Sequence, residues 1–496
     1  KKEEGTISSS GGSVTFSSTL DPIDSASSIN LTINTASSDP NVTGTINVQG
    51  LGDLSHIFGN INLTGGSIVL GKTASSNGSF TINNTQPITI SVGDFDVGSF
   101  NQIGTGAVSL AASIVTPGSI SFEGALIISG NTMLQGSKGL TLSSSITPSS
   151  ANCDLTLNAG SYPLRIKSLG SADVPFGALS ITASTLDLGG DVYSSSSIKI
   201  DSPITISANT KISSAGVNGL TLTKPVTVTA GSVTPTLTLD ATSAGAVDVN
   251  SLGSDAAPLG VVSLSGKNVY LSGNIASIAS VGIFGPVTIY KAAQLRGDLG
   301  ITLDQNLAPN VDPVDLTLQA SNGTVNVKNL GTDMSPLQNI SIISSGPIGS
   351  GKLICKGGID LSGTTITLGS NVTASSYVKI ANTDLLTISS ANLNLTEDFV
   401  QSGSGNVSLG ASIATSGSIS FTGVLTIESS TILKGDKGIT ITGSIGPLSG
   451  SPNLTLNAGN NPLKANFLGS EDIPFGSLNI TALTLDLREM FMQALP

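Results

Sequence analysis

Histidine, cysteine and clustered carboxylates are the residues that most often do chemistry, and this chain of 496 residues offers few of them. Its single histidine, His56, lies in the stretch GDLSHIFGN, which holds no partner for a catalytic triad or a zinc site. The two cysteines, Cys153 and Cys355, fit no CxxC or metal-ligand spacing. We therefore predict a surface or turn role for His56 and unpaired cysteines. We also predict no catalytic, cofactor-binding or metal-binding residues.

Among enzymes, those that cleave polysaccharides are the most serious alternative, because many of them are β-solenoids. The triplet RIK at 165–167 resembles a substrate-binding fragment of polygalacturonases. The DD and GHG motifs of that family are absent, and a second copy of the triplet reads KAN at 464–466. We expect no enzyme, and the alternative function is a polysaccharide-binding or polysaccharide-degrading β-helix protein.

Composition argues against several other classes of protein. The net charge of −12 is unsuited to nucleic acid, whose phosphates must be neutralised by Lys and Arg. No apolar run reaches the roughly 18 residues that a membrane span needs, so we expect no membrane insertion. Hydrophobic residues make up 38% of the chain, which is too much for a disordered coil. With 4% aromatic residues and no Trp, the core must consist of many small aliphatic contacts.

An internal repeat is the strongest signal in the sequence. The stretch LTLNAGSYPLRIKSLGSADVPFG at 155–177 returns as LTLNAGNNPLKANFLGSEDIPFG at 454–476. At this offset of 299, residues 104–188 align with 403–487 without a gap, and 50 of 85 positions are identical. A second offset, 138, aligns 286–303 with 424–441. Leu-Gly pairs that begin at 51, 169, 252, 330 and 468 mark about five super-repeats, whose variable spacing predicts that whole coils were gained or lost.

The elements that carry the repeat are predicted to be short β-strands. Aliphatic and small polar residues alternate in runs such as LTL, LSI and ITI, which Gly, Pro and Asn-Ala-Gly turns separate. Such short strands and so few aromatic residues favour a parallel β-solenoid over immunoglobulin-like sandwiches or a propeller. About 20–24 coils of roughly 20–25 residues, stacked at ~4.8 Å, would make an elongated rod of roughly 100–115 Å. The favoured hand of parallel crossovers predicts a right-handed solenoid.

The repeat also predicts a core and domain boundaries. The aliphatic positions that both copies keep are expected to point inward: Leu155, Leu157, Leu169, Leu186, Leu454, Leu456, Leu468 and Leu485. Residues 31–487 are expected to form one continuous solenoid, and residues 1–30 a cap or an inter-subunit contact. The tail REMFMQALP at 488–496 leaves the repeat, either as a truncated or mis-assembled end or as a short helix over the last coil.

The order LTLNA, LGS, P-[FL]-G and then TLDLGGDVYSSSSIKI resembles the repeats of bacterial filamentous-haemagglutinin-like and β-strand-repeat surface proteins. The resemblance covers roughly residues 30–487. It implies a β-helical adhesin stalk that is secreted by a two-partner or autotransporter route. We therefore expect a non-catalytic structural protein at the cell surface, a stalk or an extracellular filament subunit. The candidate partners are other copies of the chain, through end-to-end or lateral assembly, or host or cell-surface glycans or proteins.

Overall fold

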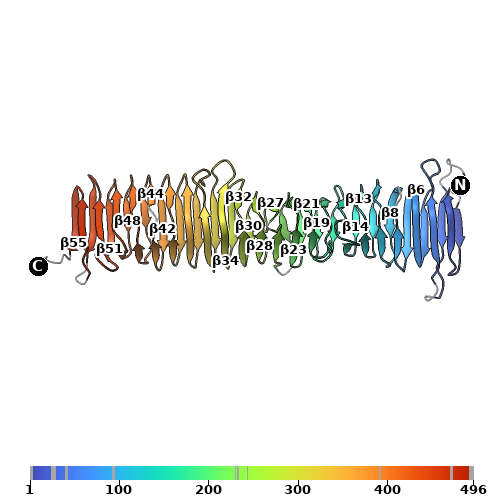
Figure 1. Ribbon diagram of the computed structural model, residues 1–496, viewed down its shortest axis with the longest axis horizontal. Coiled ribbons are helices and arrows are strands. Elements are labelled where there is room, and N and C mark those ends of the chain that lie inside the picture. Colours follow the sequence, from blue (N-terminus) through green and yellow to red (C-terminus); the bar gives the residue numbers. More distant parts are fainter. Residues whose placement is uncertain are drawn as a thin grey trace. The chain divides into compact units, whose positions relative to one another are not determined.

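The computed structural model describes residues 4–490 except 24–28, 40–42, 92–94, 230, 232–233, 243, 390–392 and 470–472. Every helix or strand element in these residues is a β-strand (Figure 1). The chain divides into two compact units, Lys1–Asn250 and Ser251–Pro496, here called the N-terminal and the C-terminal unit. Each unit is a stack of parallel coils, and the two units together make about 20 turns of a β-solenoid. The predicted fold class is therefore confirmed.

The strands of the N-terminal unit are β1 (Glu4–Ser8), β2 (Val14–Leu20), β3 (Asn30–Asn34), β4 (Thr45–Leu51), β5 (Ile61–Gly65), β6 (Ser67–Asn84), β7 (Ile88–Ile90), β8 (Phe95–Gln102), β9 (Val108–Leu110), β10 (Ile114–Thr116), β11 (Ile120–Phe122), β12 (Leu126–Ile128), β13 (Thr132–Gly136), β14 (Leu140–Leu142), β15 (Ile146–Pro148), β16 (Leu155–Asn158), β17 (Leu164–Ile166), β18 (Leu179–Thr182), β19 (Leu186–Leu188), β20 (Val192–Ser194), β21 (Ser197–Asp201), β22 (Ile204–Ile206), β23 (Thr210–Ser214), β24 (Gly219–Leu222), β25 (Val226–Val228), β26 (Leu237–Asp240) and β27 (Ala246–Val249).

The strands of the C-terminal unit are β28 (Val262–Ser265), β29 (Asn268–Leu271), β30 (Ile275–Ser277), β31 (Ser280–Phe284), β32 (Val287–Ile289), β33 (Ala293–Gly297), β34 (Gly300–Pro309), β35 (Leu316–Ala320), β36 (Thr324–Leu330), β37 (Ile340–Ser344), β38 (Ile348–Cys355), β39 (Ile359–Gly363), β40 (Ile366–Leu368), β41 (Val372–Ala374), β42 (Val378–Asn382), β43 (Leu386–Ile388), β44 (Leu393–Leu395), β45 (Phe399–Gln401), β46 (Val407–Leu409), β47 (Ile413–Thr415), β48 (Ile419–Phe421), β49 (Leu425–Ile427), β50 (Thr431–Gly435), β51 (Ile439–Pro447), β52 (Asn453–Asn457), β53 (Pro462–Leu468), β54 (Ser477–Thr481) and β55 (Thr484–Met490).

Each coil has three faces, and strands stack in parallel from one coil to the next. In the N-terminal unit β11, β12 and β13 form one coil, and β14, β15 and β16 pair in parallel with them in that order. Parallel strands are spaced by ~4.8 Å, so about ten turns give each unit roughly 50 Å of stacking height. Within a strand the burial alternates, as in β16, where Leu155 and Leu157 are buried and Thr156 faces outward. The core is therefore a narrow column of mostly aliphatic side chains.

The super-repeats of the C-terminal unit do not begin on the same face. The stack that begins at Leu252 reaches Leu318 three coils later, through Ile275 and Leu295. The next Leu-Gly pair begins at Leu330, which lies 12 residues beyond Leu318 and two faces further along the coil. Six coils beyond Leu330, the same stack reaches Leu456. The next Leu-Gly pair, at Leu468, again lies 12 residues and two faces later.

The expectation that the copies differ by whole coils is therefore wrong. The distance along the chain from one Leu-Gly pair to the next is a whole number of coils plus two further faces of a coil. This is possible because the three faces of a coil offer nearly equivalent positions for an inward-pointing aliphatic residue.

The ends of the described chain are also built of strands. β1 pairs with β3 and β2 with β4, so the stack of coils already includes part of residues 1–30. Arg488, Glu489 and Met490 belong to β55, which pairs with β53. Of the two alternatives for the tail, the short helix is therefore wrong at these three residues, and residues 491–496 lie outside the described residues.

Candidate functional site

His56 has the turn role that its surroundings predict. Its backbone N–H donates to Asp53 Oδ1 at 2.7 Å, and its Nδ1 lies 3.2 Å from the same oxygen. Backbone hydrogen bonds from Ser55 and His56 lower the pKa of Asp53. Both side chains are about half exposed, so the pair stabilises an exposed turn.

That turn belongs to a corner that all five Leu-Gly pairs build. The leucines are buried, and each glycine adopts a positive φ: Gly52 (70°), Gly170 (66°), Gly253 (70°), Gly331 (74°) and Gly469 (88°). Only glycine adopts this backbone conformation without strain. At Gly331 a Cβ would also clash with the carbonyl oxygen of Ile354 in the next coil. The repeated Leu-Gly pair is therefore explained by a corner that anchors a leucine and turns the chain.

Seven of the eight predicted core leucines are buried: Leu155, Leu157, Leu169, Leu186, Leu454, Leu456 and Leu468. Leu485 differs, because 48% of it is exposed. Its repeat equivalent Leu186 pairs with Leu164 on one side and Ile204 on the other, whereas Leu485, among the residues that the structure describes, pairs with Leu463 alone. A core position of this fold is buried only when a coil covers it on both sides.

A buried amide ladder, formed by Gln102 and Asn84 of the N-terminal unit, joins three coils. Gln102 is fully buried, and its Nε2 donates to Asn84 Oδ1 at 2.7 Å and to the carbonyl oxygens of two turn residues, Gly104 and Gly106. Its Oε1 accepts from the N–H groups of Glu123 and Gly124, both at 2.9 Å. One side chain thus bonds backbone groups of two turns, and of these Glu123 N–H also donates to the backbone carbonyl of Gln102 at 3.2 Å.

The C-terminal unit repeats this ladder with Gln401 and Asn382. Gln401 Nε2 donates to Asn382 Oδ1 at 2.8 Å and to Gly403 O and Gly405 O, and its Oε1 accepts from the N–H groups of Thr422 and Gly423. Gln401 follows Gln102 by 299 residues, but Asn382 follows Asn84 by 298. The gapless alignment begins at residue 104 and therefore does not include Asn84 and Gln102. A one-residue gap would have extended the repeat back to INNT and IANT.

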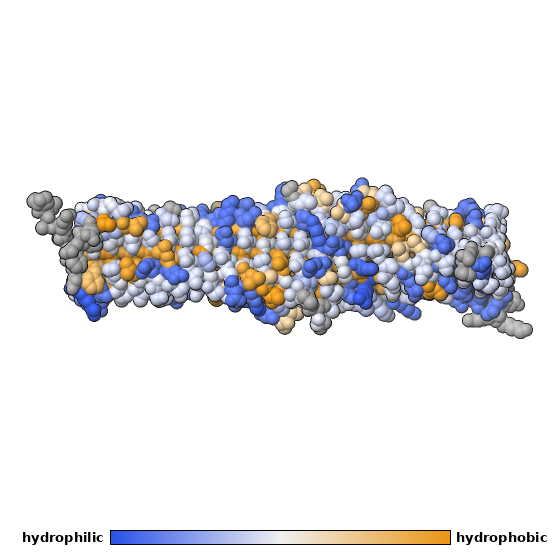
Figure 2. Space-filling view, turned by 90° about the horizontal axis from the view of Figure 1, so that it is seen from below, coloured by the Kyte–Doolittle hydropathy of each residue, from blue (hydrophilic) through white to orange (hydrophobic). Residues whose placement is uncertain are grey.

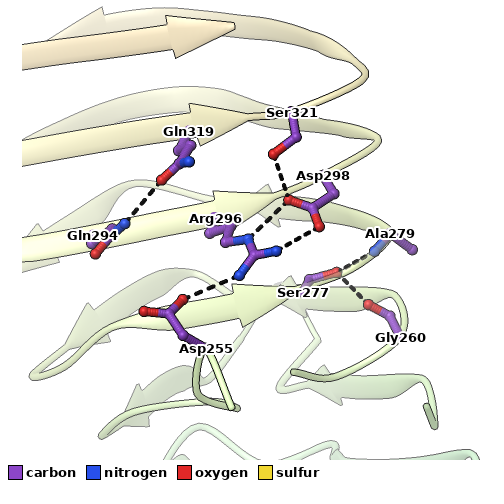
Figure 3. A network of polar contacts seen from close by, with 9 residues as sticks. All are labelled: Asp255, Gly260, Ser277, Ala279, Gln294, Arg296, Asp298, Gln319 and Ser321. Atoms are coloured by element: carbon purple, nitrogen blue, oxygen red, sulfur yellow. Dashed lines mark hydrogen bonds and ion pairs between the residues drawn. The ribbon is translucent and has the colours of Figure 1, made fainter. Parts of the chain in front are cut away.

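Figure 3 shows a network around Arg296 in the C-terminal unit. Its guanidinium donates to Asp298 at 2.9 and 2.8 Å and to Asp255 Oδ1 at 3.3 Å. The hydrogen bond from Arg296 lowers the pKa of Asp298, whose side chain is 16% exposed. Asp298 Oδ1 also accepts from Ser321 in the next coil, so the network ties neighbouring turns together.

The two cysteines lie in different units, and both are free and buried. Cys355 Sγ lies 3.3 Å from the carbonyl oxygen of Gly357. Burial raises the pKa of the Cys355 thiol to about 12. A thiol with so little thiolate character is a poor nucleophile, and Cys355 therefore fits a core position.

The triplet at 165–167 borders a surface groove. Arg165 and Ile166 end β17, Lys167 follows, and both basic side chains point outward. Arg165 Nε lies 3.2 Å from Asp187 Oδ2 on the next coil. The groove runs over β14, β17 and the start of β19, and its lining includes Thr141, Arg165, Lys167 and Asp187.

The comparisons with known proteins found no relative from which a function could be inferred. No protein-family model, no curated protein and no solved structure matches the chain. Among the residues that the structure describes, no three His, Cys, Asp or Glu side chains form a group that could hold a metal ion. The same part of the chain contains no helix long and apolar enough to cross a membrane. What the arrangement provides is repeated coil-to-coil bonding through corners, core columns and amide ladders.

Proposed function

We propose that this chain is a structural spacer: a stalk or filament segment exposed at the surface of a bacterial cell, of the adhesin-like kind that its repeats resemble. The observation that carries the proposal is the bonding within each unit. Strand after strand pairs in parallel with the same face of the coil before it and the coil after it. The buried residues are overwhelmingly aliphatic and serve this stacking. A chain whose repeated residues mainly make contacts between coils is suited to provide length and stiffness.

Resistance to extension follows from the direction of these bonds. Backbone hydrogen bonds join each coil to the next along the stack, and the buried amide ladders add side-chain bonds between turns. Charged residues make up only 10% of the chain, which limits repulsion between neighbouring coils. On the face seen in Figure 2, hydrophobic residues are interspersed with hydrophilic ones in both units.

A polysaccharide-binding β-helix protein is the second candidate. The groove beside Arg165 favours it, because this surface is basic in an otherwise acidic chain. The two functions are compatible, since a spacer can also bind a glycan along its side.

Antibody labelling of intact cells tests the proposal. The protein should be labelled without permeabilisation, and gold particles should lie on fibres or stalks that project from the envelope. Removal of the gene should remove these structures. Labelling only after permeabilisation would contradict a surface-exposed spacer.

A further inference from the structure

The chain holds three Asn-Gly pairs, at 77–78, 218–219 and 322–323. An Asn-Gly pair can react with itself, because glycine has no side chain to hinder its backbone nitrogen from reaching the side-chain amide of the preceding asparagine. The amide must be accessible, and all three asparagines are exposed. The backbone nitrogen must also be free to move toward the amide carbon. The three pairs differ in this second requirement.

Two of the pairs are held by hydrogen bonds. Gly78 lies inside β6, where its N–H donates to Gly59 O at 2.9 Å and to Ser76 Oγ at 3.2 Å. Gly219 begins β24, and its N–H donates to Gly216 O at 3.0 Å. A backbone nitrogen that is bound in this way reacts only after its hydrogen bond has broken and the strand has opened locally.

The third pair lies in the corner between β35 and β36. Both of its residues are outside these strands, and among the described residues the N–H of Gly323 has no hydrogen-bond partner. The groups around it are bonded: Asn322 N–H donates to Asp298 O at 2.7 Å, and Gly323 O accepts from Ser344 Oγ at 2.7 Å. Figure 3 shows the hydrogen bond at this corner from Ser321 to Asp298. The pair at 322–323 thus combines an exposed side-chain amide with a free backbone nitrogen.

The local sequence does not account for this difference. Asn77 lies in Ser-Asn-Gly-Ser and Asn322 in Ser-Asn-Gly-Thr, so the two pairs have nearly the same chemical neighbours. In the unfolded chain the two asparagines should therefore react at about the same rate. A difference between them in the folded chain would come from the fold, which binds the N–H of Gly78 and leaves that of Gly323 free.

We propose that the pair at 322–323 is a self-modification site, at which the folded chain converts Asn322 to aspartate and isoaspartate. The nitrogen of Gly323 attacks Cγ of Asn322, and the new C–N bond closes a succinimide ring. The bond from Cγ to Nδ2 breaks, and Nδ2 leaves as ammonia with the proton that the Gly323 nitrogen gives up. Water then opens the ring. Attack of water at the side-chain carbonyl gives aspartate, and attack at the backbone carbonyl gives isoaspartate.

The isoaspartate product should loosen the corner. It routes the backbone through the former side chain and so lengthens the chain between two contacts, the bond from Asn322 N–H to Asp298 and the bond from Ser344 to Gly323. These contacts hold the corner to both neighbouring coils, so the longer backbone should break one of them. Thr324 begins the pairing of β36 with β34 directly after the corner, and the loosening should reach this strand. The spacer function does not depend on this site, so the two proposals can fail separately.

Peptide mapping by mass spectrometry tests the proposal on the full chain after incubation at mildly alkaline pH. In the folded chain Asn322 should be converted at least about tenfold faster than Asn77, the factor that corresponds to one hydrogen bond of about 1.4 kcal/mol. In guanidinium, which unfolds the chain, the two should react at about the same rate. Asn322→Gln would have to close a larger ring and should stop the reaction at this site. The matched control Asn77→Gln should leave the conversion of Asn322 unchanged.

Hydrogen exchange separates the effect of the backbone linkage from that of the added charge. The aged chain should exchange faster than the fresh chain at residues 321–327, whereas Asn322→Asp, which adds the charge to a normal backbone, should not. Equal exchange in the aged and the fresh chain would refute the loosening of the corner. The modification site is overturned if Asn77 is converted as fast as Asn322 in the folded chain, or if Asn322 reacts only in the unfolded chain.

Discussion

Removal of the Gln102 side-chain amide should open the fold locally. Gln102→Leu keeps the size of the side chain but removes the partner of four buried groups, which are Gly124 N–H, Asn84 Oδ1 and the carbonyl oxygens of Gly104 and Gly106. Each buried polar group left unsatisfied costs about 1–3 kcal/mol, so the loss should cost at least about 2 kcal/mol. Because neighbouring coils depend on these turns, the loss should appear first as local opening around residues 100–126.

Hydrogen exchange followed by mass spectrometry is the suitable assay, because a long repeat protein need not unfold in a single step. A cost of 2 kcal/mol or more should speed exchange in residues 100–126 at least about 30-fold. Gln401→Leu should do the same around residues 399–425. The control Gln338→Leu changes an exposed glutamine and should leave exchange unchanged. Unchanged protection in Gln102→Leu would refute the argument that the buried amide ladder stabilises these turns.

Three further predictions concern single sites. Leu186→Asp buries a charge and should cost several kcal/mol of local stability, measured by hydrogen exchange around residue 186, whereas Leu485→Asp, at the half-exposed equivalent, should cost less than about 1 kcal/mol around residue 485; equal costs would contradict the burial argument. Arg296 lowers the pKa of Asp298, so this pair stabilises the fold above the ordinary carboxyl pKa of about 3.9 and the contribution is lost as the pH falls through the lowered value. Arg296→Met should remove that part of the acid dependence, and an unchanged stability–pH curve would contradict it. The Cys355 thiol, with a pKa of about 12, should resist iodoacetamide at pH 8 in the folded protein and react on unfolding; rapid alkylation of the folded protein would contradict its burial.

Much of the fold could be predicted because the signal is local. The alternation in LTLN sets which side chains of β16 point inward, and the gapless repeat carries the same pattern to β52. The Leu-Gly pairs were likewise visible, since a glycine that needs a positive φ recurs in every super-repeat. Each of these features depends on a few adjacent residues.

Features that depend on neighbouring coils were harder to predict. Leu485 has the sequence of a core residue, and it is exposed where the described residues supply a coil on one side of it. The shift of a super-repeat from one face to another leaves no local trace, because all three faces accept the same alternation. Gln102 lies two residues outside the gapless repeat, and its partner Asn84 lies in the preceding coil. β14 and β17 share no ladder pairing, and no single stretch of the sequence predicts this.

Cryo-electron microscopy of the purified chain, together with the cells that produce it, tests the spacer claim most directly. The account predicts narrow rods with a repeat of ~4.8 Å along their length, and fibres on the cell surface that an antibody against the chain decorates. Compact particles without this axial repeat, or fibres that persist unlabelled when the gene is removed, would contradict it.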